Sequence, residues 1–199
     1  MESEARSHPG RQPLLFFGLP GSGKSHCAKL AEEELGYEFH EGDHWLPEDL
    51  KANLARGQGF DDEQRLRFAN EVADKMASAR SHPEARPLAV SQAVFQRRCR
   101  DAIRAKHPDV VFVWVRADTP SRQARLAKGG NLVDKALGQK MKNDFEEPAE
   151  DELHVLLTLD NHRVDHSTEI AHHELRNQLR QVAHAASRLH ARQHAAMQN

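Results

Sequence analysis

The sequence predicts one α/β domain in which helices cover both faces of a five-stranded parallel sheet. Three observations predict this architecture. Short apolar segments alternate along the chain with longer stretches of helix-forming residues. The segment 110–115 is apolar without a break, which is typical of a strand buried on both faces of a parallel sheet. A length of 199 residues suits one domain with a full hydrophobic core.

Glycine and proline mark most boundaries between the expected elements. Gly36 ends the first helix, and Pro47 opens the second. Thr119 is the expected N-cap of a later helix, with Pro120 at its first position. Strands are expected at 14–17, 37–40, 87–90, 110–115 and 153–159. Helices are expected up to 35 and then at about 47–55, 61–80, 95–106, 119–128, 134–144 and 166–197.

A glycine-rich segment joins the first strand to the first helix. It reads G-x-x-x-x-G-K-S, and its strand–loop–helix setting is the one that a phosphate-binding loop needs. Glycines allow successive N–H groups to point at phosphate oxygens, and the helix N-terminus adds partial positive charge. Lys24 is expected to reach the β- and γ-phosphates, and the Ser25 hydroxyl to bind Mg²⁺. The predicted nucleotide-binding residues here are Gly18, Gly21, Ser22, Gly23, Lys24, Ser25 and His26.

Two carboxylates follow the second strand, at the same edge of the sheet as the glycine-rich loop. Asp43 is the expected catalytic base, because a carboxylate there could accept the proton of an attacking hydroxyl on a bound acceptor. Glu41 is the expected second Mg²⁺ ligand, directly or through water. The alternative is a solvated turn that bends at Gly42.

Basic residues cluster in three places on the expected helices. Phosphoryl transfer spreads negative charge over the phosphate oxygens, so cationic groups are expected near it. Arg125 is assigned to catalysis and Lys128 to the nucleotide. A guanidinium also matches a carboxylate in bidentate fashion, so Arg65 and the cluster Arg97/Arg98/Arg100 are candidates for the acceptor. Arg97 and Arg98 are chosen, although which member of that cluster contacts the acceptor stays open.

Composition bounds the class of partner. The net charge is −2 with histidine neutral, so nothing predicts a nucleic-acid partner or an anionic membrane surface. No apolar run approaches 18 residues, and the polar lead-in 1–12 has no apolar core, so neither a signal peptide nor a membrane span is expected. Cys27 and Cys99 favour reduced thiols over a disulfide. A cytoplasmic protein is expected.

These motifs carry a family likeness. Over about residues 13–160 the chain resembles the gluconokinases of the shikimate kinase-like P-loop group. The likeness rests on the glycine-rich loop, Glu41-Gly42-Asp43, Pro47, Gly57, Asp62, Arg65, Arg100-Asp101-x-x-Arg104, Arg125-Leu126, Phe145 and Glu147-Pro148. It implies a P-loop NTPase three-layer fold of the shikimate/NMP kinase type, with a kinase core at 13–165, an acceptor segment at about 43–80, a lid at about 125–140 and a C-terminal helix at 166–199.

The same resemblance implies Mg-ATP as donor and a sugar acid or polyol as acceptor, gluconate being the first guess. A homodimer is plausible by the same likeness. The sequence departs from the family pattern mainly on the acceptor side, where Leu46 before Pro47, Leu50, Asn53, Arg67-Phe68 and the segment 91–96 replace family residues. Two alternatives therefore stay open: a kinase of a nucleotide, a nucleoside or a shikimate-like acid, and a nucleotide-binding regulatory protein with little kinase activity.

Overall fold

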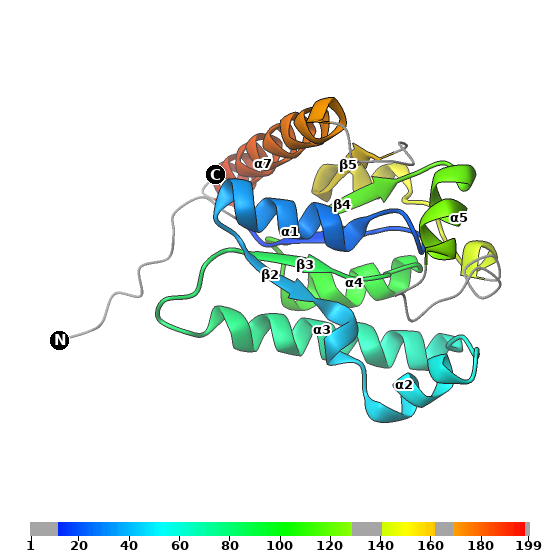
Figure 1. Ribbon diagram of the computed structural model, residues 1–199. Helices are drawn as coiled ribbons and strands as arrows, with labels where there is room; N and C mark the ends of the chain where they lie inside the picture. Colours follow the sequence, from blue (N-terminus) through cyan, green and yellow to red (C-terminus); the bar gives the residue numbers. More distant parts are fainter. Residues whose placement is uncertain (1–11, 129–140, 162–168, 198–199) are drawn as a thin grey trace.

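A computed structural model describes residues 12–128, 141–161 and 169–197 of the chain. Five parallel strands form one sheet in the order β2-β3-β1-β4-β5, with the loop-bearing strand β1 at its centre (Figure 1). The predicted parallel α/β sheet is therefore confirmed. The strands are β1 Leu14–Phe17, β2 Glu38–Glu41, β3 Leu88–Ser91, β4 Val111–Arg116 and β5 Leu156–Asp160.

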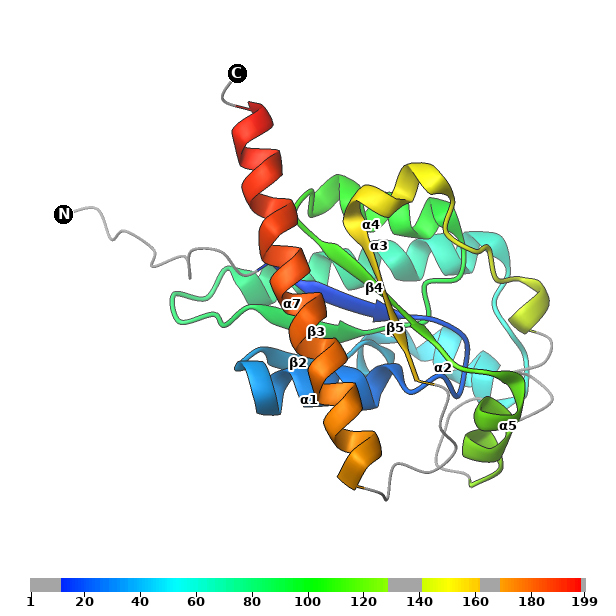
Figure 2. The same cartoon turned by 90° about the horizontal axis from the view of Figure 1, so that it is seen from above.

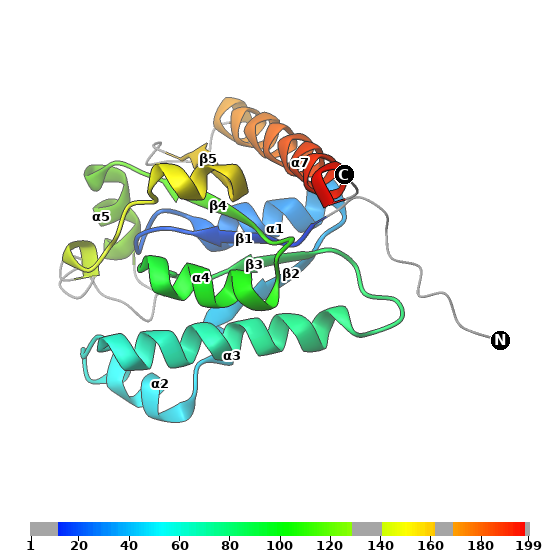
Figure 3. The ribbon, with the colours of Figure 1, turned by 180° about the vertical axis from the view of Figure 1, so that it is seen from behind.

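Helices cover both faces of this sheet (Figures 1 and 3). Helices α1 and α7 lie on one face, and α3 and α4 on the other. The long helix α7 crosses the sheet, and its last turns extend past the other elements (Figure 2). The helices are α1 Lys24–Leu35, α2 Glu48–Ala55, α3 Asp62–Arg80, α4 Arg97–Lys106, α5 Thr119–Ala127 and α7 Glu169–Met197, with 3₁₀ turns η1 Gly42–Trp45 and η2 Glu150–Val155.

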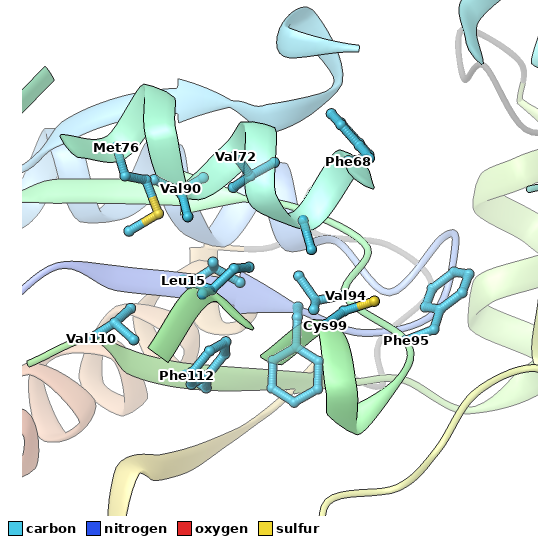
Figure 4. Packing of buried hydrophobic residues seen from close by; sticks show 14 of the residues in the cluster. Leu15, Phe68, Val72, Met76, Val90, Val94, Phe95, Cys99, Val110 and Phe112 are labelled. Carbon is cyan, nitrogen blue, oxygen red and sulfur yellow. The ribbon is translucent and has the colours of Figure 1, made fainter. Parts of the chain in front are cut away.

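The hydrophobic core has one layer on each side of the sheet. Alternate residues of β1 face opposite sides, as the pleat of a strand requires. Leu15 and Phe17 pack with α3 and α4, in a layer where Val72 and Met76 of α3 and Phe112 of β4 are fully buried (Figure 4). Leu14 and Phe16 point to the other face and pack with α1 and α7. Burying both faces of β1 fixes the strand from which the glycine-rich loop emerges.

Helix α3 begins at the predicted place, and the structure shows the local reason. The Asp61 side chain accepts a hydrogen bond from the Gln64 amide at 2.8 Å, and the Gln64 side chain accepts one from the Asp61 amide at 3.1 Å. This reciprocal capping box satisfies two amides that the helix leaves without partners.

Several predicted boundaries differ from the structure by one to three residues, and two differences have a clear local cause. The N-cap of α5 is Asp118, whose carboxylate accepts from the Ser121 amide at 2.8 Å, so Thr119 is the first helical residue. A carboxylate cap also complements the partial positive charge of the helix N-terminus. The fifth strand begins at Leu156 instead of 153, because η2 precedes it. The side chain of Glu152 within η2 is buried against α4, which holds this segment in a turn.

Several other expectations can be compared with the described residues. Cys27 and Cys99 are free, buried thiols, as predicted. Within the described part of the chain, no helix combines the length and the apolar character that crossing a bilayer requires. The helix expected at 134–144 is described only at its end, at 141–143. Most of the expected lid and nearly all of the lead-in lie outside the described residues.

Candidate active site

The loop between β1 and α1 owes its shape to glycine at positions where backbone comes close. Gly21 has φ 78°, and a Cβ there would lie 2.6 Å from the carbonyl oxygen of Arg122. Gly23, the N-cap of α1, has φ 93°, and its Cβ would lie 2.3 Å from Nδ2 of Asn161. Any side chain would be strained by both the dihedral angle and the contact. The motif is therefore fixed by packing against α5 and the end of β5.

Arg125 and Asn161 hold the loop by its carbonyl groups. Nη1 of Arg125 donates to the carbonyl oxygens of Gly21 and Ser22, each at 3.2 Å, and Asn161 Nδ2 donates to the Ser22 carbonyl at 2.8 Å. Nη2 of Arg125 donates to the Asn161 carbonyl at 3.1 Å. The Ser22 carbonyl and the Gly23 N–H belong to one trans peptide and therefore point in opposite directions. The Gly23 N–H thus points away from Arg125 and Asn161. Gly23 lines the cavity described below.

Lys24 stands at the first position of α1, between the loop and two carboxylates. Its Nζ donates to the Leu19 carbonyl oxygen at 3.4 Å. Burial lowers the pKa of the Lys24 ammonium, while the charges of Asp43 and Glu41 act in the opposite direction. A partly buried cation with two nearby carboxylates is typical of a functional site.

Oxygen atoms from α1, β2 and β3 meet beside this lysine. The hydroxyl oxygens of Ser25 and Ser91 are 3.1 Å apart. Burial raises the pKa of Glu41, and the Asp43 charge adds to this effect, whereas hydrogen bonds from Ser25 and Ser91 oppose it. Carboxylate and hydroxyl oxygens are the ligands that Mg²⁺ prefers, and this ion keeps several waters or phosphate oxygens as well. The residues present therefore fit a magnesium ion.

Asp43 lies in η1, directly after β2, and its position is set by the neighbouring strand β3. Nε2 of Gln92 donates to Oδ1 of Asp43 at 3.4 Å. Gly42 packs closely on the same segment, since a Cβ there would lie 2.7 Å from the Ser91 carbonyl oxygen. The turn that carries Asp43 is thus held against the end of β3, and its carboxylate faces the cavity.

One cavity of about 340 Å³ joins these groups. Its loop side contains Gly21, Gly23, Lys24, Ser25 and His26, and its far side is formed by α2, α3 and the β3–α4 loop. Arg65 lies on the far side with 9% of its surface exposed. Its Nη2 donates to Oδ2 of Asp144 at 2.7 Å, and its guanidinium lies 5.3 Å from the Phe95 ring centre. The cavity thus connects a phosphate-type loop with a second compartment.

The structure brings most of the predicted site residues to this cavity. Those that line it are Gly21, Gly23, Lys24, Ser25, His26, Glu41, Asp43, Arg65 and Arg125. Gly18 and Ser22 do not line it. The Ser22 side chain is buried, and its amide donates to the Leu19 carbonyl within the loop. Gly18 and Ser22 therefore shape the loop from behind. Lys128, the C-cap of α5, is exposed and also lies outside the described lining.

Arg97 and Arg98, the residues predicted to bind the acceptor, are placed on the outer side of α4. Arg97 is exposed and makes a bidentate ion pair with Asp151, at 2.9 and 2.6 Å. Arg98 is also exposed and pairs with Asp62 at 3.2 Å. Neither lines the cavity. The first turn of α4 directs both side chains outward, so their clustering in the sequence reflects a solvated helix face.

Arg100, the third member of that cluster, is completely buried. It makes a bidentate pair with Glu152, in which Nε and Nη2 donate at 2.7 and 2.9 Å. Its Nη1 donates to the carbonyl of Phe95 at 3.2 Å. Burial alone would raise the pKa of Glu152, but the hydrogen bonds from Arg100 bring it below its ordinary value. Arg100 is a structural residue that ties α4 to η2.

Arg125 lines the cavity, but its hydrogen bonds differ from the predicted role. Its guanidinium is engaged with loop carbonyls and with Asn161. Burial lowers the pKa of Arg125. In this structure the side chain braces the loop, so a place over the transferring phosphoryl group would require it to exchange these partners.

Sequence reasoning missed three polar residues that shape the site. Ser91 ends β3, Gln92 follows that strand, and Asn161 follows β5. Their common signal is position, because ligands bind at the carboxyl ends of parallel strands. Those ends are visible in the sequence, but the pairing of β3 with β1 and β2, which aims the residues at the loop, is not.

Fold and site together define a P-loop kinase. The glycine loop, its lysine, the adjacent oxygen cluster and a carboxylate across the cavity stand at the carboxyl edge of a parallel sheet. Comparison with known proteins agrees. A family model described as adenylylsulphate kinase matches residues 12–156. An adenylyl-sulfate kinase of Shewanella baltica strain OS155 is 31% identical over 173 residues, covering 81% of this chain and 80% of the relative.

Gluconokinases are also similar to this chain. The thermosensitive gluconokinase of Escherichia coli K12 is 25% identical over 159 residues, covering 79% of this chain and 84% of the relative. The crystal structure of a gluconokinase from Sinorhizobium meliloti 1021 superposes with a TM-score of 0.69 at 22% identity, covering 88% of this chain and 95% of that one, which shows the shared fold. The chain belongs to the adenylylsulphate kinase family and is an ATP-dependent small-molecule kinase of the group that includes gluconokinases.

Proposed function

We propose that this protein transfers the γ-phosphoryl group of Mg-ATP to a hydroxyl group of a small acceptor. The observation that carries the proposal is the placement of Asp43 in the same cavity as Lys24 and the glycine loop. A carboxylate opposite a phosphate loop can accept a proton from an alcohol that attacks the γ-phosphorus. Gluconate is the first acceptor that the gluconokinase relatives suggest.

In the proposed step, the acceptor oxygen forms a bond to the γ-phosphorus while the bond to the β,γ-bridging oxygen breaks. The hydroxyl proton passes to Asp43, and ADP leaves with the bridging oxygen. Lys24 and the Gly23 amide hold the phosphate oxygens as their charge redistributes. Gln92 orients the Asp43 carboxylate through its hydrogen bond.

Ser25 and Glu41 would hold the magnesium ion, with Ser91 in contact with both side chains. When bound, such an ion neutralises charge on the phosphate oxygens. The positive charge of the ion would offset the cost of burying the ionised Glu41 carboxylate. Arg65 would contact the acceptor from the far side of the cavity. The cytoplasm, favoured by the two free thiols, is the proposed compartment.

The test is an acceptor panel with Mg-ATP and the variant Asp43→Asn. Removing the base should lower turnover by about 10²- to 10⁴-fold, the usual contribution of general acid–base catalysis, while Mg-ATP binding measured by calorimetry is retained. Arg98→Gln is the matched control, because that residue lies outside the cavity. Its turnover should stay within about twofold of the original.

Two other outcomes of the acceptor panel would contradict the proposal. Full turnover in Asp43→Asn would remove this carboxylate from the reaction. Slow ATP hydrolysis that is the same with every acceptor would favour a nucleotide-binding regulatory protein over a kinase.

A further inference from the structure

The part of the cavity beyond Asp43 has a mainly apolar wall. It is contributed by α2, α3, the loop before α3, the residue after η1 and the β3–α4 loop. Most of these side chains are more than 90% buried and belong to the larger hydrophobic cluster on this face of the sheet (Figure 4 labels Phe68, Val94 and Phe95). The apolar wall consists of Leu46, Leu54, Phe60, Phe68, Val94 and Phe95.

Polar groups in this compartment are few, and most are already engaged. Gln92 donates to Asp43 and accepts from the Ala93 amide. Arg65 is the one cation on this side among the described lining residues. A guanidinium has five N–H groups, and only Nη2 of Arg65 has a hydrogen-bond partner in the described part of the chain, Asp144. Arg65 therefore retains donors for one anionic group.

This distribution of polar groups matters for the acceptor. A polyhydroxy acid carries a hydroxyl on nearly every carbon, and each one buried without a partner loses its hydrogen bonds to water. Beside the apolar wall such hydroxyls have few side-chain partners, because Arg65 and Gln92 are the polar residues that the described lining offers on this side. A molecule with methylene or ring carbons at the same positions gains from burial instead.

Resting on the kinase function above, we propose that the natural acceptor is an alcohol with an apolar chain or ring and a single anionic group. Its hydroxyl faces Asp43, its anionic group pairs with Arg65, and its body lies against the apolar wall. The bond changes are those given above: the acceptor oxygen joins the γ-phosphorus, the bridging oxygen leaves with ADP, and the proton goes to Asp43.

A matched pair of acceptors tests this. Gluconate and 6-hydroxyhexanoate share a carbon chain, a terminal hydroxyl and a carboxylate, but the second lacks the secondary hydroxyls. Initial rates of ADP formation, with the product verified by phosphorus NMR, should give 6-hydroxyhexanoate at least about 100-fold higher kcat/KM, because one unmatched hydroxyl can already cost that factor. 1,6-Hexanediol, which lacks the carboxylate, should be at least about tenfold poorer than 6-hydroxyhexanoate because it cannot pair with Arg65.

Two isosteric variants separate the wall from general effects on folding. Val94→Thr adds a hydroxyl to the wall and should reduce the preference for 6-hydroxyhexanoate by about 3- to 10-fold. Val72→Thr makes the same change in the same hydrophobic cluster, at a fully buried position that does not line the cavity. It should leave the preference unchanged.

A binding readout distinguishes this inference from the reaction itself. In the presence of a non-hydrolysable ATP analogue, 6-hydroxyhexanoate should raise the Tm and gluconate should not. A preference for gluconate in turnover would overturn the inference and leave the kinase function standing. A Tm rise with 6-hydroxyhexanoate alone, without transfer, would retain the acceptor compartment and remove the transfer step. No Tm rise with 6-hydroxyhexanoate would overturn the inference.

Discussion

The arginine side chains of this protein have different roles, and each role depends on the groups that the guanidinium contacts. Arg65 is buried at the cavity, Arg97 is exposed in a pair with Asp151, and Arg100 is buried in a pair with Glu152. Exposed pairs contribute little to stability, and a buried pair depends on both partners. The residue type alone therefore does not reveal which guanidinium meets a ligand.

This contrast gives a prediction for the acceptor. Arg65→Gln should raise KM for an anionic acceptor by about tenfold or more, since it removes the one cation of the described acceptor compartment. Arg97→Gln should change KM by less than about twofold, because its side chain pairs with Asp151 outside the cavity. Steady-state kinetics at fixed Mg-ATP measure both. Equal effects of the two variants would contradict the assignment of Arg65.

Lys24 gives a prediction in which stability and binding move in opposite directions. Burial lowers its pKa, so the favourable contribution of this group is present above its ordinary value of 10.5 and is lost as the pH falls through the lowered pKa. At pH 7, which is below 10.5, the desolvation of this group therefore lowers the free energy of unfolding. Lys24→Met should leave the Tm of the free protein unchanged or higher.

The same Lys24→Met variant should lose the rise in Tm that Mg-ATP gives the unaltered protein, a stabilisation of roughly 2.7 kcal/mol at a ligand concentration of 100 Kd. Lys29→Met, on the same helix but exposed, is the control and should keep it. A retained Mg-ATP shift in Lys24→Met would exclude the lysine from phosphate binding.

At the scale of elements, the Arg100–Glu152 pair links α4 to η2 just before β5. The two side chains are 0% and 1% exposed, and their bidentate geometry satisfies most of their polar atoms. Cation–ring contact with Phe17, at 5.4 Å, adds a third element, β1. The pair therefore holds η2 against α4 and β1 directly before β5.

The pair makes stability depend on pH. Because the pKa of Glu152 is lowered on folding, its contribution is present above the unfolded value, near 4.5, and is lost as the pH falls through the folded value. Glu152→Gln should destabilise the protein at pH 7 by roughly 3–5 kcal/mol, since the buried Arg100 loses its counter-charge. Urea unfolding should show this difference shrinking below about pH 4.5. A constant difference from pH 7 to pH 3.5 would contradict the ionic role of the pair.

The molecule as a whole explains how far sequence reasoning could go. The glycine loop, most helices and the five strands follow from local patterns, because periodicity, caps and glycine act over a few residues. The positions of Glu41 and Asp43 followed from strand β2 and the loop sharing one sheet edge. Local patterns could not show that Arg97 faces solvent while Arg65 lines the cavity, since this depends on how α3 and α4 pack together. The apolar wall was also hidden, because cavity and core residues look alike in sequence.

The glycine loop is supported by a residue that lies far away in the sequence, and the effect of this contact on nucleotide binding can be tested. Asn161 donates to the Ser22 carbonyl across 139 positions of sequence. Asn161→Ala removes a hydrogen bond of about 1 kcal/mol, which should weaken Mg-ATP binding about fivefold in calorimetry. Gln178→Ala is the control, because Gln178 lies on α7 and accepts from the Asp160 amide next to Asn161 without bonding to the glycine loop. A similar loss in both variants would show that the effect comes from β5 in general.

The hydrogen bond between Asn161 and Ser22 also affects how the protein folds during translation. At a translation speed of about 5–20 residues per second, the ribosome makes the glycine loop roughly 7–28 s before it reaches Asn161. Throughout that interval the nascent loop lacks the hydrogen bond from Asn161, and for most of it the sheet lacks its edge strand β5. The nascent chain should therefore reach its full affinity for ATP late in synthesis. Cellular nucleotide would then stabilise the completed fold but would not direct the early steps of folding.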